Sequence, residues 1–165
     1  MKTDYNLKEI TLAAFEQFMT TDQQDAEKRP GYGKWSAKEI MGHLIDSATN
    51  NHGRFVRAQD TKDLIGQGYD QDAWVMAQNY QAMNWDDIII LWRQLNMHLA
   101  YVIEQTPDDV RDLARTSHNL HQIAFNTVPE DQPTTLAYFM EDYVLHLKHH
   151  LGQVRSALSV EDGKE

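Results

Sequence analysis

The amino-acid sequence predicts an all-α fold, a four-helix bundle with two long connections. Four long segments carry apolar residues at every third or fourth position, which is the period of one face of an α-helix. No segment has the alternating pattern of a strand, and no stretch repeats another. Because 165 residues are enough for one sizeable core, we expect a single antiparallel-type bundle domain over residues 1–165.

The first helix is expected over residues 6–20, where the apolar period begins. Asn6 and Glu9 stand in the relation of a capping residue and its reciprocal acid. The polar residues 21–34 that follow are predicted to form a loop, because the segment ends in three helix-breaking residues, Pro30, Gly31 and Gly33.

The second helix is expected over residues 35–60 and has the clearest start signal in the chain. Ser36 and Glu39 have the spacing of a capping box, in which each side chain bonds the backbone of the other residue. Trp35 and Ile40 occupy the positions of a hydrophobic staple around it. These signals predict a helix that starts sharply.

Residues 61–83 are predicted to form a connection that contains a short helix, which Asp72 would cap and Tyr80 would end. The third long helix is expected over residues 84–105. Asn84 has the position of its capping residue, and two aspartates in the first turn suit the positive end of a helix dipole.

Residues 107–133 form a second long connection with no sustained period. Loops of this length inside a compact domain often cover a functional site. His118 and His121 lie in this loop, where they can approach a metal or substrate or can be incidental. The fourth long helix is expected to start at Thr134 or Thr135.

Composition excludes several classes of function. The formal net charge is -10 and Lys and Arg form no run, which argues against nucleic acid as a partner. No stretch approaches the ~20 apolar residues of a membrane span, and the first residues lack the apolar run of a secretory signal, so we expect a cytoplasmic protein with no membrane partner. The chain has no cysteine, so any metal must be held by His, Asp or Glu.

The segment DYVLHLKHHLGQ, residues 142–153, places three histidines within the fourth helix. His146 and His150 are four residues apart, so they lie on one face, where two imidazoles can bind one metal ion. His149 points to the far side and is expected to be solvated. A metal site would require a third ligand.

His43 in the second helix can supply that ligand. Taken alone, its position off the apolar face predicts a surface histidine. Helix bundles, however, build metal sites from facing helices, and His43 together with His146 and His150 would make a three-imidazole site with room for a reactant. Asp46, one turn on, can orient an imidazole, act on substrate, or be a solvated helix residue. The stripe of His43 continues through Ser47, Asn50 and Arg54.

Three motifs carry a family resemblance: WSAKEIMGHLIDS, YDQDAW and HLKHHLGQ, which begin at Trp35, Tyr69 and His146. They resemble the DinB/YfiT-like superfamily of small metal-binding four-helix bundles, and most of all its YfiT branch, which includes metal-dependent hydrolases and bacillithiol transferases. The resemblance implies that His43, His146 and His150 are the metal ligands and that His149 is a neighbour that does not ligate. The sequence departs from the pattern of the YfiT branch at Gly42, where that branch often has a histidine.

This resemblance and the histidine spacing leave three hypotheses. In the first, a divalent ion, zinc or nickel, binds a low-molecular-mass thiol and presents it to an electrophile. In the second, water replaces the thiol, and Asp46 accepts its proton in a metal-dependent hydrolysis. In the third, the protein is a non-catalytic, stress-associated bundle. The resemblance also implies a small-molecule substrate and a homodimer.

Overall fold

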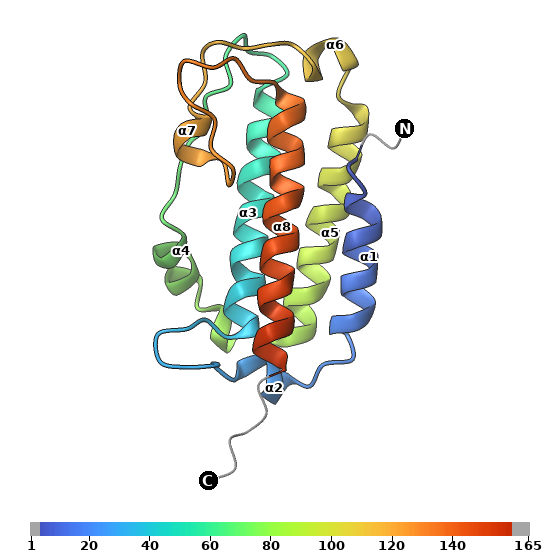
Figure 1. The fold of residues 1–165 in the computed structure, drawn as a ribbon. Helices are drawn as coiled ribbons and strands as arrows, with labels where there is room; N and C mark the ends of the chain where they lie inside the picture. The colour runs from blue at the N-terminus through green and yellow to red at the C-terminus, as the bar shows by residue number, and fades with distance from the viewer. Residues whose placement is uncertain (1–3, 160–165) are drawn as a thin grey trace.

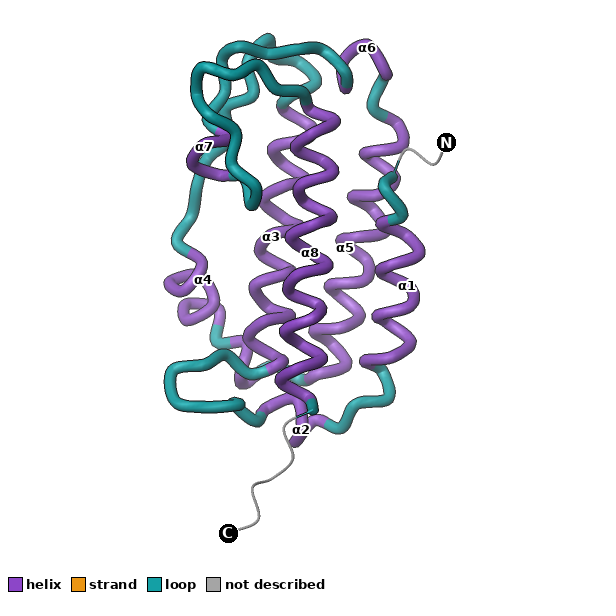
Figure 2. Tube along the Cα trace, in the orientation of Figure 1, coloured by secondary structure: helices purple, strands orange, loops and turns teal. Residues whose placement is uncertain are grey.

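The computed structural model describes residues 4–159, and Figure 1 shows four long helices packed side by side. The long helices are α1 (Leu7–Phe18), α3 (Ala37–Arg57), α5 (Trp85–Gln105) and α8 (Leu136–Leu158). The shorter ones are α2 (Gln23–Glu27), α4 (Gln71–Gln78), the 3-10 helix η1 (Tyr80–Ala82), α6 (Asp108–Arg111) and α7 (Leu120–Ile123). Figure 2 shows helices joined by loops, and no strand longer than an isolated bridge occurs in this part of the chain.

The long helices pack in the order α1, α5, α3 and α8. Helices α1 and α8 run opposite to α3 and α5, as Figure 1 shows. Ser36, just before α3, bonds Gln81, just before α5, and the rings of His52 and His98 lie 5.0 Å apart near the other ends. The neighbours α3 and α5 are therefore parallel, so the expected antiparallel arrangement is wrong for this pair. The connection formed by residues 58–84 is long because it returns the chain to the end of the bundle at which α3 began.

Helix α3 lies between α5 and α8 and is buried over most of its length. Its predicted capping box is confirmed. The Ser36 hydroxyl accepts a hydrogen bond from the Glu39 backbone at 3.3 Å, and the Glu39 carboxylate accepts one from the Ser36 backbone at 2.9 Å. Two of the free N–H groups at this helix end are satisfied in this way, which fixes where the helix starts.

Two other predicted caps are wrong. Asn6 has a φ of 64° and its side chain makes no cap; the Asp4 carboxylate instead accepts from the Asn6 and Lys8 backbones, both at 3.2 Å. Helix α4 is capped by Asp70 rather than Asp72, two residues earlier than expected. In both segments an aspartate two residues before the predicted cap accepts the backbone hydrogen bonds instead.

The segment predicted to be a loop after α1 contains the short helix α2, capped by Asp22. The fourth long helix starts as predicted, because the Thr135 hydroxyl accepts from the Tyr138 backbone at 3.1 Å. The long connection between α5 and α8 holds α6 and α7 and is pinned by two isolated bridges, Leu64 with His118 and Arg115 with Thr134. None of the helices described is long and apolar enough to cross a membrane.

Gly42 lies where an aromatic ring packs against α3. A Cβ at this position would lie 2.1 Å from a ring carbon of Tyr80. Tyr80 is buried, and its hydroxyl donates a 2.7 Å hydrogen bond to Asp46, one turn further along the same helix. Glycine at position 42 therefore admits the ring that covers this face of α3.

We expect Gly42→Ala to destabilise the protein by about 1–3 kcal/mol, because the overlap with Tyr80 outweighs the roughly 1 kcal/mol that alanine contributes to a helix. Urea unfolding would measure the change. Gly152→Ala is the matched control: Gly152 is exposed in α8 with no atom near its Cβ position, so this variant should be equally or more stable than wild type. Equal effects of the two substitutions would contradict the role assigned to Gly42.

Candidate metal centre

The antiparallel packing of α3 against α8 places His43 opposite His146 and His150. One nitrogen from each ring lies within 4.8 Å of the others. The Nε2 atoms of His43 and His146 are 3.3 Å apart, and the ring centroid of His150 is 4.7 Å from that of His43 and 4.4 Å from that of His146. The structure thus brings together the three histidines that were grouped from the sequence as candidate metal ligands.

All three imidazoles are uncharged at neutral pH. Burial lowers the pKa of His43 from 6.5 to about 4, with a smaller contribution from His150. Burial also lowers the pKa of His146 to about 3, assisted by the neighbouring histidines, and it lowers the pKa of His150. Neutral imidazoles have a free lone pair, which is the form that binds a metal. His43, expected alone to be a surface residue, is only 2% exposed, so that expectation is wrong.

Hydrogen bonds orient two of the three rings. The amide oxygen of Gln153 lies 2.7 Å from Nδ1 of His150, and since this oxygen can only accept, it fixes the proton on Nδ1 and leaves the lone pair on Nε2. The Ser47 hydroxyl lies 3.4 Å from Nδ1 of His146, and because a hydroxyl can accept as well as donate, this contact permits the same tautomer without fixing it. Nδ1 of His43 has no such partner in the described chain, and this ring is held by packing, 5.5 Å from the Trp35 ring.

This donor set fits a divalent ion such as zinc or nickel. Nitrogens that bind a tetrahedral zinc ion at about 2.0–2.1 Å lie about 3.3 Å from one another. The Nε2 atoms of His43 and His146 are separated by 3.3 Å, which matches this spacing. Imidazole suits both zinc and nickel, and three protein ligands leave a position for a reactant.

His149 does not join the cluster of His43, His146 and His150. It is exposed, as expected, but it lies at the cavity rim rather than on the far side, with its ring centroid 5.2 Å from that of His150. Its Nε2 is 3.2 Å from the Gln153 amide nitrogen, so Gln153 bridges both rings.

His118 and His121 lie outside the cluster too. His118 is buried, and its ring bonds the carbonyl of Gln132 and the backbone N–H of Leu120. It holds the long connection together. His121 pairs with the side chain of its neighbour, Gln122.

Asp46 is buried rather than solvated, at 2% exposure. Its Oδ1 accepts hydrogen bonds of 2.7 Å from the Tyr80 hydroxyl and from the Gln78 amide. Burial raises the pKa of Asp46, and these two hydrogen bonds partly offset that rise. Asp46 is not among the residues that line the cavity beside the histidines.

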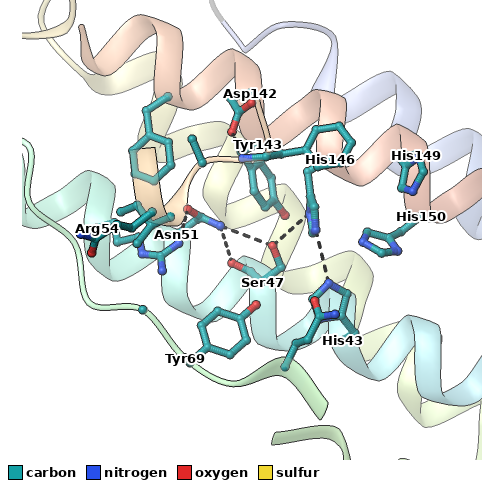
Figure 3. A pocket seen from close by; sticks show the side chains of 17 residues that line it. His43, Ser47, Asn51, Arg54, Tyr69, Asp142, Tyr143, His146, His149 and His150 are labelled. Atoms are coloured by element: carbon teal, nitrogen blue, oxygen red, sulfur yellow. Dashed lines mark hydrogen bonds between the residues drawn. The ribbon is translucent and has the colours of Figure 1, made fainter. Parts of the chain in front are cut away.

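The histidine cluster opens into a cavity of about 470 Å³. Its walls come from α3, from α8, from residues 68–71 and from residues 122–125, and Figure 3 shows the labelled side chains that point into it. Residues 122–125 of the long connection thus line this cavity, as expected of a loop that covers a site, and the function of the cavity stays a prediction. Asn51 rather than Asn50 continues the stripe of His43 along the cavity wall.

Asp142 holds the covering loop in place, a role that sequence reasoning missed. Its carboxylate accepts hydrogen bonds of 2.7 Å from the backbones of Phe125 and Asn126, and one of 3.0 Å from the Asn126 side chain. The sequence offered only one signal, an aspartate one helical turn before His146, and its burial is visible only in the structure. Its partners lie 16 and 17 residues upstream, where no local pattern identifies them.

Comparison with known proteins identifies the family of this chain. The sequence profile described as "DinB superfamily" matches residues 8–154. The chain belongs to the DinB superfamily. Among DinB relatives, a "Putative metal-dependent hydrolase" of Bacillus cereus is 23% identical over 138 residues, which cover 82% of this chain and 71% of the relative. A protein of the same description from Bacillus thuringiensis subsp. konkukian matches at the same identity and coverage.

One solved structure matches this DinB protein over 93% of its length and over 82% of the other chain, with a TM-score of 0.73 and 17% identity. It is YfiT from Bacillus subtilis, described as "a probable metal-dependent hydrolase with an unusual four-helix bundle topology". The predicted DinB/YfiT-like fold is therefore confirmed. The assignment of His43, His146 and His150 as metal ligands stays a prediction.

We expect His43→Ala, His146→Ala and His150→Ala each to weaken binding of zinc or nickel by at least about 100-fold, because each removes one of three converging lone pairs. Isothermal titration calorimetry on chelator-treated protein would measure the affinity. His149→Ala is the control that removes a neighbouring imidazole and should retain near-wild-type binding. An equal loss on His149→Ala would refute this ligand set.

The depressed histidine pKa values make the stability of the metal-free protein depend on pH. The pKa of His43 falls from 6.5 to about 4 on folding, so the unfolded chain takes up this proton at a higher pH than the folded chain. The contribution of His43 to the free energy of unfolding is fully present above about pH 6.5 and is lost as the pH falls toward 4. The corresponding loss from His146 extends this pH range down to about 3.

Urea unfolding of metal-free wild type and His43→Gln over this pH window would measure the effect. The wild type should lose on the order of 2 kcal/mol more than the variant on acidification, because glutamine has no proton to gain. Parallel stability curves for the two proteins would contradict the burial of an uncharged imidazole at position 43.

Proposed function

We propose that this protein is a divalent-metal-dependent enzyme that transfers a low-molecular-mass thiol to an electrophilic small molecule. The observation that carries the proposal is a cluster of three neutral imidazoles, from His43, His146 and His150, at one end of a 470 Å³ cavity. A cavity of this size suits a small molecule. A divalent ion at such a site lowers the pKa of a thiol or water molecule that binds it.

The carboxylates around the site favour a thiol over water as nucleophile. Asp142 is the only acidic residue among the described residues that line the cavity, and three hydrogen bonds occupy its oxygens. Asp46 is engaged with Tyr80 and Gln78 outside the cavity lining. A thiol has a pKa near 8.5 in its ordinary state and water a pKa near 15.7, so a thiol depends far less on a protein base. No cysteine of the chain supplies this sulfur, which therefore arrives with a substrate.

The residues around the histidines would position the nucleophile. Gln153 and Ser47 hold the rings of His150 and His146 so that their lone pairs converge. The loop that Asp142 pins over the cavity would limit the access of water. In the transfer, the thiol loses its proton to solvent, a sulfur–carbon bond forms, and the leaving group departs with the electron pair of the bond that breaks.

Metal-dependent hydrolysis is the second candidate, and the description of the Bacillus relatives as metal-dependent hydrolases favours it. In that reaction Asp46 would be the proton acceptor. Burial raises the pKa of this carboxyl, which suits a general base near neutral pH. Its side chain would first have to exchange its hydrogen bond with Tyr80 for one with water in the cavity.

The two reactions differ in their need for a thiol. Protein loaded with zinc or nickel is incubated with an aryl halide or a nitrophenyl ester, with and without a panel of low-molecular-mass thiols. We expect a thioether product that requires metal, thiol and aryl halide together, with at least about a 100-fold loss in His146→Ala. Ester cleavage without thiol would instead support hydrolysis. Tight metal binding with neither reaction would support a non-catalytic bundle.

A further inference from the structure

A cationic side chain lines the cavity at the end away from the histidines. Figure 3 shows Arg54 on one side of the cavity and His43, His146 and His150 on the other, with Ser47, Asn51 and Tyr69 between them. Arg54 lies eleven residues after His43 in α3, which corresponds to about 16 Å along the helix axis. The two ends of the cavity therefore carry different chemistry.

The Arg54 guanidinium is held in a fixed position. Its carbon lies 6.0 Å from the Tyr69 ring centre and 5.9 Å from that of Phe139, so the guanidinium is in cation–π range of both rings. One terminal nitrogen donates to the Asn51 side-chain oxygen at 3.2 Å, and the other donates to the Gln67 carbonyl at 2.5 Å. Such a rigid fork loses little entropy when it binds a planar anion.

This cation has spare donors and no carboxylate partner. A guanidinium carries five N–H groups, and two of those on Arg54 are used by the bonds to Asn51 and Gln67. Its Nε is buried and has no hydrogen-bond partner within the described chain. No ion pair joins Arg54 to an acidic residue in residues 4–159. Asp142, which lines the same cavity from α8, is occupied by the covering loop.

A chain of hydrogen bonds links this position to the metal centre. Arg54 donates to the Asn51 oxygen, the Asn51 amide donates to the Ser47 hydroxyl at 3.3 Å, and that hydroxyl lies 3.4 Å from Nδ1 of His146. The same wall of α3 therefore fixes the distance between the guanidinium and a metal ligand. The affinity for a ligand that spans both ends of the cavity would therefore depend on the length of the ligand as well as on its charge.

We propose that Arg54 binds a carboxylate group of the substrate, while the reacting atom of the same molecule lies at the histidine cluster. The inference rests on the proposed function and narrows its substrate class to small molecules that carry an anionic group remote from the reacting atom. A partly buried guanidinium with no anionic partner has lost some of its hydration, and a bidentate carboxylate offsets that loss when it binds. Arg54 is thus a specificity-determining residue of the cavity.

The test uses zinc-loaded protein and a graded series of aliphatic hydroxamic acids, whose hydroxamate binds a divalent ion whether the natural reaction is thiol transfer or hydrolysis. Each probe is made in two forms of equal length, one ending in a carboxylate and the other in a carboxamide. At the best length, we expect the carboxylate form to bind wild type at least about tenfold more tightly in calorimetric titrations. This comparison requires no variant, so it holds even if a substitution at Arg54 impairs folding.

Arg54→Gln should abolish the preference for the carboxylate form and leave the affinity of the carboxamide form unchanged, whereas Arg54→Lys should retain part of the preference. Arg57→Gln is the matched control, because it removes the same charge from an exposed position of the same helix outside this cavity, and it should keep the full preference.

Equal affinity of the two forms for wild type would overturn this inference and leave the proposed function standing. A uniform loss of both forms in Arg54→Gln would also overturn it, since that result assigns Arg54 to holding the loop at Gln67. Failure of every hydroxamate to bind the zinc-loaded protein would overturn the proposed function and this inference with it.

Discussion

The antiparallel contact between α3 and α8 is the constraint on which the rest of the structure depends. It brings residues more than a hundred positions apart in sequence, His43 and His146, to within 3.3 Å. The same contact buries apolar rings at its other end, where Phe55 lies 5.6 Å from Phe139. Apolar packing thus offsets the cost of burying three polar imidazoles in one place. The histidines can remain uncharged and close together because the helices cannot move apart without exposing this core.

Neighbouring elements support that contact from both sides. On one side of α3, Tyr80 packs against the bare backbone at Gly42 and bonds Asp46. Along α8, Asp142 ties down the long connection that closes the cavity. Both carboxylates lie within one turn of a histidine of the cluster, yet each accepts hydrogen bonds from other parts of the fold. The site therefore has rigid walls and few free acids.

Sequence reasoning succeeded where the signal was local. The capping box at Ser36 and the start of α8 at Thr135 depend on residues within a turn of one another, and both were predicted correctly. The histidine pair on one face of α8 follows from helix geometry alone. Periodicity alone placed His43 on the surface. The link from this pair to His43 came from the general rule that bundles build metal sites from facing helices, and the family resemblance supported it.

The errors arose where distant residues decide the outcome. Nothing near His43 in sequence reveals that α8 buries it, and nothing near Asp142 reveals that Phe125 will bond it. The parallel relation of α3 and α5 has the same origin. Residues 61–83 were identified as a connection, but the sequence pattern of that segment does not indicate at which end of the bundle the next helix starts.

The cavity is assembled from two kinds of chain segment. Its histidines lie on long helices that pack in the bundle core, whereas residues 122–125 of its wall belong to the connection between α5 and α8. Hydrogen bonds to the side chains of Asp142 and Tyr138 hold this connection to α8. A change of residue in that loop can reshape the space available to a bound molecule while the distances among the imidazoles stay the same. Natural variation could therefore alter which molecules this scaffold accepts and preserve the chemistry it performs on them.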